Sequence, residues 1–254
     1  MVFVFPEWAL AGWWGLFAGT ALLLGAAAGY WIAAPPRVVA SVMAFGSGVL
    51  LSAISFELLD EAFALGGADS SIPGLVAGGL VFTTANVLLA RRGAKHRKRS
   101  GSALIPQDEF EGSGLAIAAG SVMDGIPESI AIGLTLLGGA TVSIPTVLAI
   151  FLSNIPEGLS SSAGLKARGW RARSVLLLWA AIAAVSGVAS LAGYVLFGHF
   201  GPGVNALVLA FAAGGVLAMV ADTMIPEAFS EAHSLSGMVT VLGFATSFLL
   251  SKLL

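Results

Sequence analysis

The sequence is poor in charge and contains no cysteine. Only 10% of its 254 residues are charged, whereas soluble domains carry about 25%. Without cysteine, the chain forms no disulfide, no thiolate metal site and no cysteine nucleophile. It also lacks a hydrophilic stretch long enough to fold as a soluble domain. These absences exclude cysteine-based chemistry and a soluble globular protein.

Hydrophobic residues make up 57% of the chain, and the mean hydropathy is +0.93. Such a composition predicts an all-α membrane protein, folded as a single transmembrane domain over residues 1–254. Gly, Pro and polar clusters divide the chain into eight apolar segments, each long enough to cross a hydrocarbon core about 30 Å thick. The expected spans are 8–32, 38–63, 71–90, 113–138, 142–165, 174–197, 203–230 and 236–254.

Basic residues sort to one side of this arrangement. All but one of the 12 Lys and Arg residues fall in the first, third and fifth loops, and Lys252 is the exception. Because cytoplasmic loops are rich in Lys and Arg, both termini are expected outside and the 91–112 loop in the cytoplasm, in a plasma (inner) membrane. The first residues have no basic region and no small-residue cleavage site, so we expect a retained first helix.

Two segments of the chain repeat each other. The first repeat segment, 43–63, aligns without gaps to the second repeat segment, 209–229, with identical residues at 7 of 21 positions. The two segments belong to the second and seventh spans, which cross the membrane in opposite directions. This pattern predicts a 3+2+3 inverted repeat, in which helices 1–3 match helices 6–8 around a central pair, and such repeats are typical of transporters.

The central pair carries the same costly motif twice. "DGIPES" (124–129) lies in the fourth span and "SNIPEG" (153–158) in the fifth. Asp124 and Glu128 share a helix face, and Ser153 and Glu157 have the same spacing. Each carboxylate near the bilayer centre costs about 2.5–3.5 kcal/mol on insertion scales. The three acids must therefore face one another, water or a cation instead of lipid.

The prolines and the side-chain oxygens both favour a cation. Pro127 and Pro156 have no N–H, so two backbone carbonyls lose their helical partners. No Lys, Arg or His lies in either expected span to balance the acids, which leaves protonation or a bound cation. Oxygen ligands of this kind suit a hard divalent ion. The predicted metal ligands are Asp124, Glu128, Ser153, Asn154 and Glu157.

With these motifs, the sequence resembles the ZIP family of zinc and iron transporters. The family pattern is His-Asn-x-Pro-Glu-Gly on each central helix, and the resemblance extends over nearly the whole chain. Asp124 stands at the first His position, Ser153 at the second, and Gly125 at the helix-four Asn. In "SGVASLAG" (186–193), Ser190 stands at the sixth-helix Glu of the family. Family members hold two metals side by side, and the second site would keep only Glu128, Asn154 and Glu157.

The resemblance implies a divalent metal transporter, with a midplane site between the fourth and fifth helices. Zinc is the substrate implied by the family, whereas the oxygen-only ligand set suits manganese, iron or another hard cation. The alternative is a non-transporting ZIP-like membrane protein that senses metal or acts as a scaffold. We expect no enzyme activity and no nucleic-acid partner. The expected partners are the metal ion, the lipid bilayer and a second copy of the chain in a homodimer.

Overall fold

The computed structural model describes residues 6–32, 34–89, 91, 113–137 and 141–253. These residues form helices joined by short turns, with no strand among them, which confirms the predicted all-α class. Most of the predicted 91–112 loop lies outside the described residues. The elements are α1 (Glu7–Trp31), α2 (Pro36–Ala53), η1 (Ile54–Leu58), α3 (Leu59–Leu89), α4 (Ser113–Leu134), α5 (Ile144–Ala167), α6 (Ala172–Phe197), α7 (Pro202–Met219), η5 (Val220–Met224), α8 (Ile225–Ala232), η6 (His233–Leu235) and α9 (Ser236–Leu253).

Five helical stretches in the described part of the chain are long and apolar enough to cross a membrane. They are Glu7–Trp31, Pro36–Leu89, Ala172–Phe197, Pro202–Ser230 and His233–Leu253. The 54-residue stretch from Pro36 to Leu89 is not one straight rod, because Gly67 within α3 has a φ of 62°. That left-handed conformation favours glycine and reverses the chain there. The count of eight spans stays a prediction.

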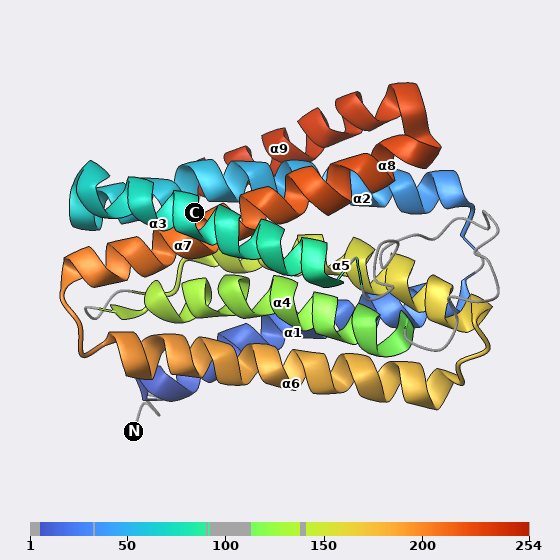
Figure 1. Ribbon diagram of the computed structural model, residues 1–254, viewed down its shortest axis with the longest axis horizontal. Coiled ribbons are helices and arrows are strands. Elements are labelled where there is room, and N and C mark those ends of the chain that lie inside the picture. The colour runs from blue at the N-terminus through green and yellow to red at the C-terminus, as the bar shows by residue number, and fades with distance from the viewer. Residues whose placement is uncertain (1–5, 33, 90, 92–112, 138–140, 254) are drawn as a thin grey trace.

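The helices run side by side along the long axis of the molecule (Figure 1). α1 packs mainly on α5 and α6, α4 on α6 and α7, and α5 on α1 and α2. α3 lies against α7, and α2 lies against α9. Consequently α4 and α5, the helices with the Pro-Glu motifs, touch each other only over a short stretch and are held in place mainly by other helices.

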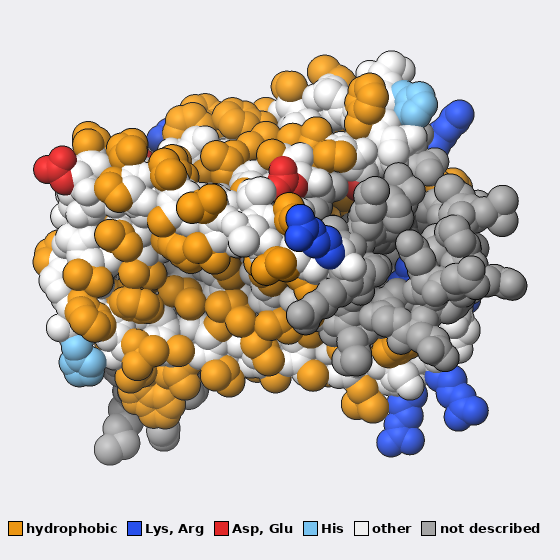
Figure 2. Space-filling model, in the orientation of Figure 1, with side chains coloured by type: hydrophobic (Ala, Val, Ile, Leu, Met, Phe, Trp, Pro, Cys, Tyr) orange, Lys and Arg blue, Asp and Glu red, His pale blue; other side chains and the backbone are white. Residues whose placement is uncertain are grey.

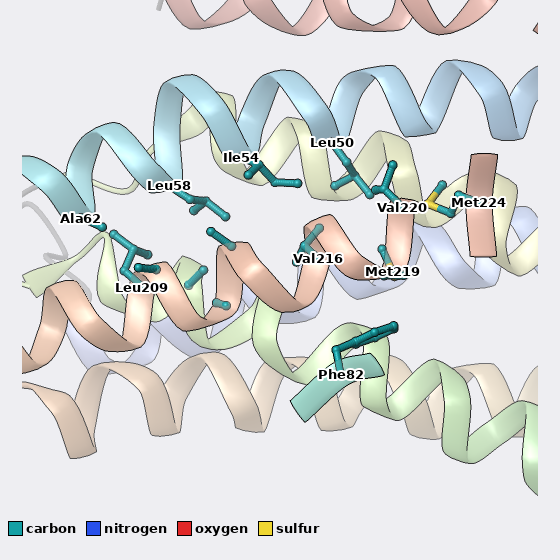
Figure 3. Close-up of a cluster of buried hydrophobic side chains, with 14 of the residues drawn as sticks. Leu50, Ile54, Leu58, Ala62, Phe82, Leu209, Val216, Met219, Val220 and Met224 are labelled. Carbon is teal, nitrogen blue, oxygen red and sulfur yellow. The ribbon is translucent and has the colours of Figure 1, made fainter. Parts of the chain in front are cut away.

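The largest buried cluster lies between the second and seventh expected spans (Figure 3). Side chains from α2 and η1 meet side chains from α7 and η5, and Phe82 of α3 closes one side. η1 and η5 are π-helices, each a single wide turn within a longer helix. Turns of this kind are rare and occur frequently at functional sites.

Glycines let several helix pairs approach to backbone contact. At each of four positions a Cβ atom would overlap a carbonyl oxygen of the neighbouring helix, so only glycine fits there without movement. Two of these contacts join α2 to α9, and two join α3 to α7. Small residues at such interfaces are typical of membrane helix packing. The contacts are Gly48 with Thr240, Gly243 with Phe45, Gly214 with Leu75 and Gly78 with Phe211.

The surface is apolar along the helices and charged toward its ends. Figure 2 shows hydrophobic side chains over most of the face in view, with Lys and Arg gathered toward one end. The exposed large side chains include Leu80 of α3, Val188 of α6 and Leu253 of α9. An apolar belt of this kind fits a bilayer, and the five apolar stretches support an integral membrane protein.

Candidate functional site

All five predicted ligand side chains are buried inside the helix bundle. Asp124 and Glu128 come from α4, and Ser153, Asn154 and Glu157 come from α5; each exposes between 2 and 5% of its surface. Because α4 and α5 are surrounded by other helices, these side chains avoid the insertion cost of a carboxylate that faces lipid. A metal could reach them only through the protein interior.

Prolines lie in the interior of both helices at the same point of the motif. Pro127 lies in α4 and Pro156 in α5, each directly before its glutamate. Gly46 of α2 packs against Pro156: a Cβ there would lie 2.9 Å from the proline Cγ and 3.5 Å from the Cα of Ser153. The absence of a side chain at Gly46 therefore allows α2 to approach α5 beside the candidate ligands.

Hydrogen bonds fix the orientation of two of the α5 ligands. Asn154 donates from Nδ2 to the carbonyl of Ala18 in α1, over 3.0 Å. Ser153 donates from its hydroxyl to the carbonyl of Ile150, over 2.9 Å. In both side chains the donor group is therefore used by the backbone, and oxygen lone pairs are left to bind a cation. α1 thus orients the Asn154 amide without contributing a charged side chain.

The same face of α5 contacts α1 at every fourth residue. After Asn154 comes Gly158, where a Cβ would overlap the carbonyl of Leu22. Next, the hydroxyl of Ser162 donates to the carbonyl of Ala26 over 2.9 Å. Finally, Lys166 donates from Nζ to the carbonyl of Tyr30 over 2.6 Å. We call these four contacts the α1–α5 ladder; they hold the ligand-bearing helix in a fixed register against α1.

The described residues contain no group of three or more His, Asp or Glu placed to hold a metal ion. Ion binding by this set therefore requires neutral oxygens beside the carboxylates, from the Ser153 hydroxyl, the Asn154 carboxamide or water. Of the three histidines of the chain, His199 and His233 lie at helix ends away from this set, and His96 lies outside the described residues.

The Ser190 side chain of α6 points toward α1. Its hydroxyl donates to the carbonyl of Ala11 over 2.7 Å, and a Cβ at Gly15 of α1 would overlap the Cβ of Ser190. The side chain at the position of the family's sixth-helix Glu is thus fully buried between α1 and α6. There it contributes to helix packing.

One polar contact near the bundle end was not predicted from the sequence. Ser143, the N-cap of α5, donates from its hydroxyl to Oε2 of Glu57 in η1 over 2.9 Å. The same hydroxyl oxygen lies 2.9 Å from that of Thr146. A Ser directly before an apolar helix is a recognisable N-cap signal, but the partner in a distant segment has no local signal.

The described helices form a bundle that buries the five candidate ligand side chains, and their apolar stretches support an integral membrane protein. No family model matches the chain. Among known proteins, it is similar to zinc transporter SLC39A7 of Rattus norvegicus, 29% identical over 172 residues, which covers 61% of this chain and 36% of the relative. The Mus musculus protein of that name is 30% identical over 172 residues, with the same coverage.

The Homo sapiens protein of that name is 26% identical over 171 residues, or 58% of this chain and 36% of the relative. The chain thus spans about a third of the length of the curated relatives it matches. These relatives carry the names of transporters and not of enzymes. The predicted resemblance to the ZIP family of transporters is confirmed by these relatives.

Proposed function

We propose that the protein moves a divalent metal cation across the membrane through a midplane site between α4 and α5. The observation that carries the proposal is the burial of three acids, a carboxamide and a hydroxyl on two proline-containing helices. Buried carboxylates are costly unless they are paired, protonated or bound to a cation. A transported cation supplies the charge for which helices of this composition offer no Lys or Arg at the motif.

The ligand set suits hard ions. Carboxylate, carboxamide and hydroxyl oxygens bind magnesium, manganese and calcium readily, whereas zinc prefers sites that include His or Cys. The relatives are named for zinc, and the divalent affinity order still favours zinc over manganese at equal geometry. The proposed substrate is therefore zinc or a harder divalent ion, held by Asp124, Glu128, Ser153, Asn154 and Glu157.

The proposal includes the 3+2+3 inverted repeat, and the core supports it. In the alignment of the two repeat segments, Ile54 pairs with Val220 and Leu58 pairs with Met224. All four lie in the same buried cluster (Figure 3). The π-helices η1 and η5 occupy the same five aligned positions. Equivalent residues of the two segments therefore belong to one shared buried cluster.

The glycine contacts support the same repeat. Gly48 aligns with Gly214, and each meets a carbonyl of the last helix of the other half, Thr240 of α9 or Leu75 of α3. The neighbouring pairs of helices also match. α1 packs on α5 as α6 packs on α4, and α2 packs on α9 as α7 packs on α3. An arrangement that maps onto itself by exchange of halves is common among transporters that work by alternating access.

Orientation in the membrane is part of the proposal. Arg37, Lys166, Arg171 and Arg173 are all exposed, in or directly beside the turns that join α1 to α2 and α5 to α6. These turns lie at the end of the bundle where Lys and Arg gather (Figures 1 and 2). By the positive-inside rule this end faces the cytoplasm, in a plasma (inner) membrane. A homodimer is compatible with the broad apolar surface but rests on no contact described above.

The test is metal flux into proteoliposomes that contain the purified protein, with a panel of divalent ions. We expect uptake by the wild-type chain and none by Glu128→Gln or Glu157→Gln, because each change removes one negative charge from the site. Asp69→Asn is the matched control, since Asp69 is exposed and lies in the turn between the second and third expected spans. Unchanged flux in either glutamate variant would remove these residues from the transport mechanism.

A second candidate function is favoured by Ser190. Because Ser stands at the position of the family's sixth-helix Glu, the neighbouring second site lacks that acid, and the Ser hydroxyl bonds to α1 instead. A chain that binds one ion tightly without releasing it would act as a metal sensor or scaffold. The flux assay separates the two functions when it is paired with a binding measurement: binding without flux identifies the second.

A further inference from the structure

A cavity lies at the end of the bundle opposite the basic residues. Its volume is about 270 Å³, and its walls come from the start of α3, the end of α4, the α6–α7 turn and the first turns of α7. In Figure 1 these segments meet at the left end. The lining residues used below are Glu61 and Leu65 of α3, Leu134 and Leu137 at the end of α4, and Asn205 of α7.

The polar side chains in this cavity present oxygen acceptors. Glu61 is the one charged side chain in the described lining, and Asn205 is the other strongly polar one. Within the described part of the chain, Oδ1 of Asn205 is enclosed and accepts no hydrogen bond. A buried carbonyl oxygen without a partner is unfavourable. A cation, a cation-bound water or a free water would satisfy this oxygen, whereas an anion would not.

The helix ends beside the cavity also favour a cation. α4 ends at Leu134 and α6 at Phe197, so two helix C-termini lie beside the cavity. α7 begins at Pro202, so one N-terminus opposes them. Each helix end carries roughly half a unit charge, negative at the C-terminus and positive at the N-terminus. The partial charges of the three helix ends therefore sum to a negative value, which adds to the negative charge of the Glu61 carboxylate.

We propose that this cavity is a second cation site, which binds a hydrated hard divalent ion between Glu61 and Asn205. Two protein oxygens are too few to strip a divalent ion of its water, whereas the volume admits several waters beside the ion. The ion would therefore keep part of its shell, as magnesium and manganese commonly do. The proposal concerns binding, and it is independent of transport through the α4–α5 site.

The experiment measures Mn²⁺ binding to the detergent-purified full chain by electron paramagnetic resonance. The background is Glu128→Gln with Glu157→Gln, so that the α4–α5 site is silenced. We expect one remaining ion per chain, weakened about tenfold by Glu61→Gln, because affinity follows the charge of the ligands. Asn205→Asp adds a carboxylate, and for the same reason it should strengthen binding by about tenfold.

Controls separate this site from loosely bound surface ions. Glu7→Gln removes an acid from the same end of the bundle, where Glu7 bonds to Tyr194, and should leave the remaining ion in place. Retained affinity in Glu61→Gln, or no gain in Asn205→Asp, would overturn the proposal. If Glu61→Gln fails to fold, the Asn205→Asp result alone decides. If the α4–α5 site binds no ion, the Glu128→Gln, Glu157→Gln variant will bind as many Mn²⁺ ions per chain as the wild-type chain. That result is separate from the effects of Glu61→Gln and Asn205→Asp.

Discussion

At the scale of single residues, Asn154 serves two helices at once. Its amide nitrogen donates to the Ala18 carbonyl of α1, and this bond leaves the amide oxygen as a candidate ligand. A carboxylate at this position would supply oxygen but no donor, so the α1 carbonyl would lose its side-chain partner and face a negative charge. An amide is therefore the side chain that can donate to α1 and still present an oxygen beside the acids.

Ligand type at two positions should set metal preference. Asp124→His together with Ser153→His replaces two candidate oxygen ligands by imidazole. Zinc binds imidazole more tightly than manganese does. We expect the ratio of zinc to manganese affinity to rise by about tenfold, which corresponds to 1.4 kcal/mol. Competition binding in detergent, with the wild-type chain and each single variant beside it, measures the change. An unchanged ratio in the double variant would show that these two positions do not determine selectivity.

Ser190 shows where residue-level prediction reached its limit. The sequence predicted a weak second site, because Ser stands where the family has Glu. It could not predict that the hydroxyl would turn to the Ala11 carbonyl, since that depends on which face α6 presents to α1. A helix that is apolar on every side carries no periodic signal to orient it. The burial of the five candidate ligands, by contrast, was expected from the cost of charge in lipid.

At the scale of helices, hydropathy located several boundaries closely. The expected span 174–197 compares with α6 at Ala172–Phe197, and 8–32 compares with α1 at Glu7–Trp31. The length of the apolar segment determines the boundaries of both helices. The π-helix η1 had no such signal, because its composition is that of the α-helix around it. Only its alignment with η5 in the second repeat segment marks the position as special.

The α1–α5 ladder depends most on Gly158. A Cβ there would overlap the Leu22 carbonyl, so Gly158→Ala must push the two helices apart. Overpacking of this kind typically costs about 1–3 kcal/mol, and the shift should also weaken the Asn154–Ala18 bond. We expect a lower thermal unfolding midpoint and weaker metal binding. Both are measured on the purified protein, the midpoint by intrinsic fluorescence and the binding by metal titration.

The matched control is Gly237→Ala in the first turn of α9. A Cβ at Gly237 would meet nothing within 4 Å, and alanine is a better helix former than glycine by about 1 kcal/mol. This variant should be as stable as the wild-type chain or slightly more so. Equal midpoints for Gly158→Ala and Gly237→Ala would mean that α1 and α5 are not held at backbone contact.

At the scale of the whole molecule, the distribution of charge gives a direct test of topology. The chain has no cysteine, so a single one can be introduced without a background. His96→Cys lies in the basic loop expected in the cytoplasm, whereas His199→Cys lies at the opposite end of the bundle, where His199 is exposed. A membrane-impermeant thiol reagent added to intact cells should label position 199 and spare position 96. Ready labelling of position 96 would reverse the orientation.

The order of synthesis gives the α1 contacts a further consequence. α1 leaves the ribosome first among the described helices, yet its main packing partners are α5 and α6. At roughly 5–20 residues per second, many seconds pass before these partners exist. During that time Gly25 and Gly29, which later meet the α5 backbone, are open to any helix with small side chains. Assembly errors of this protein should therefore begin with a mispaired first helix.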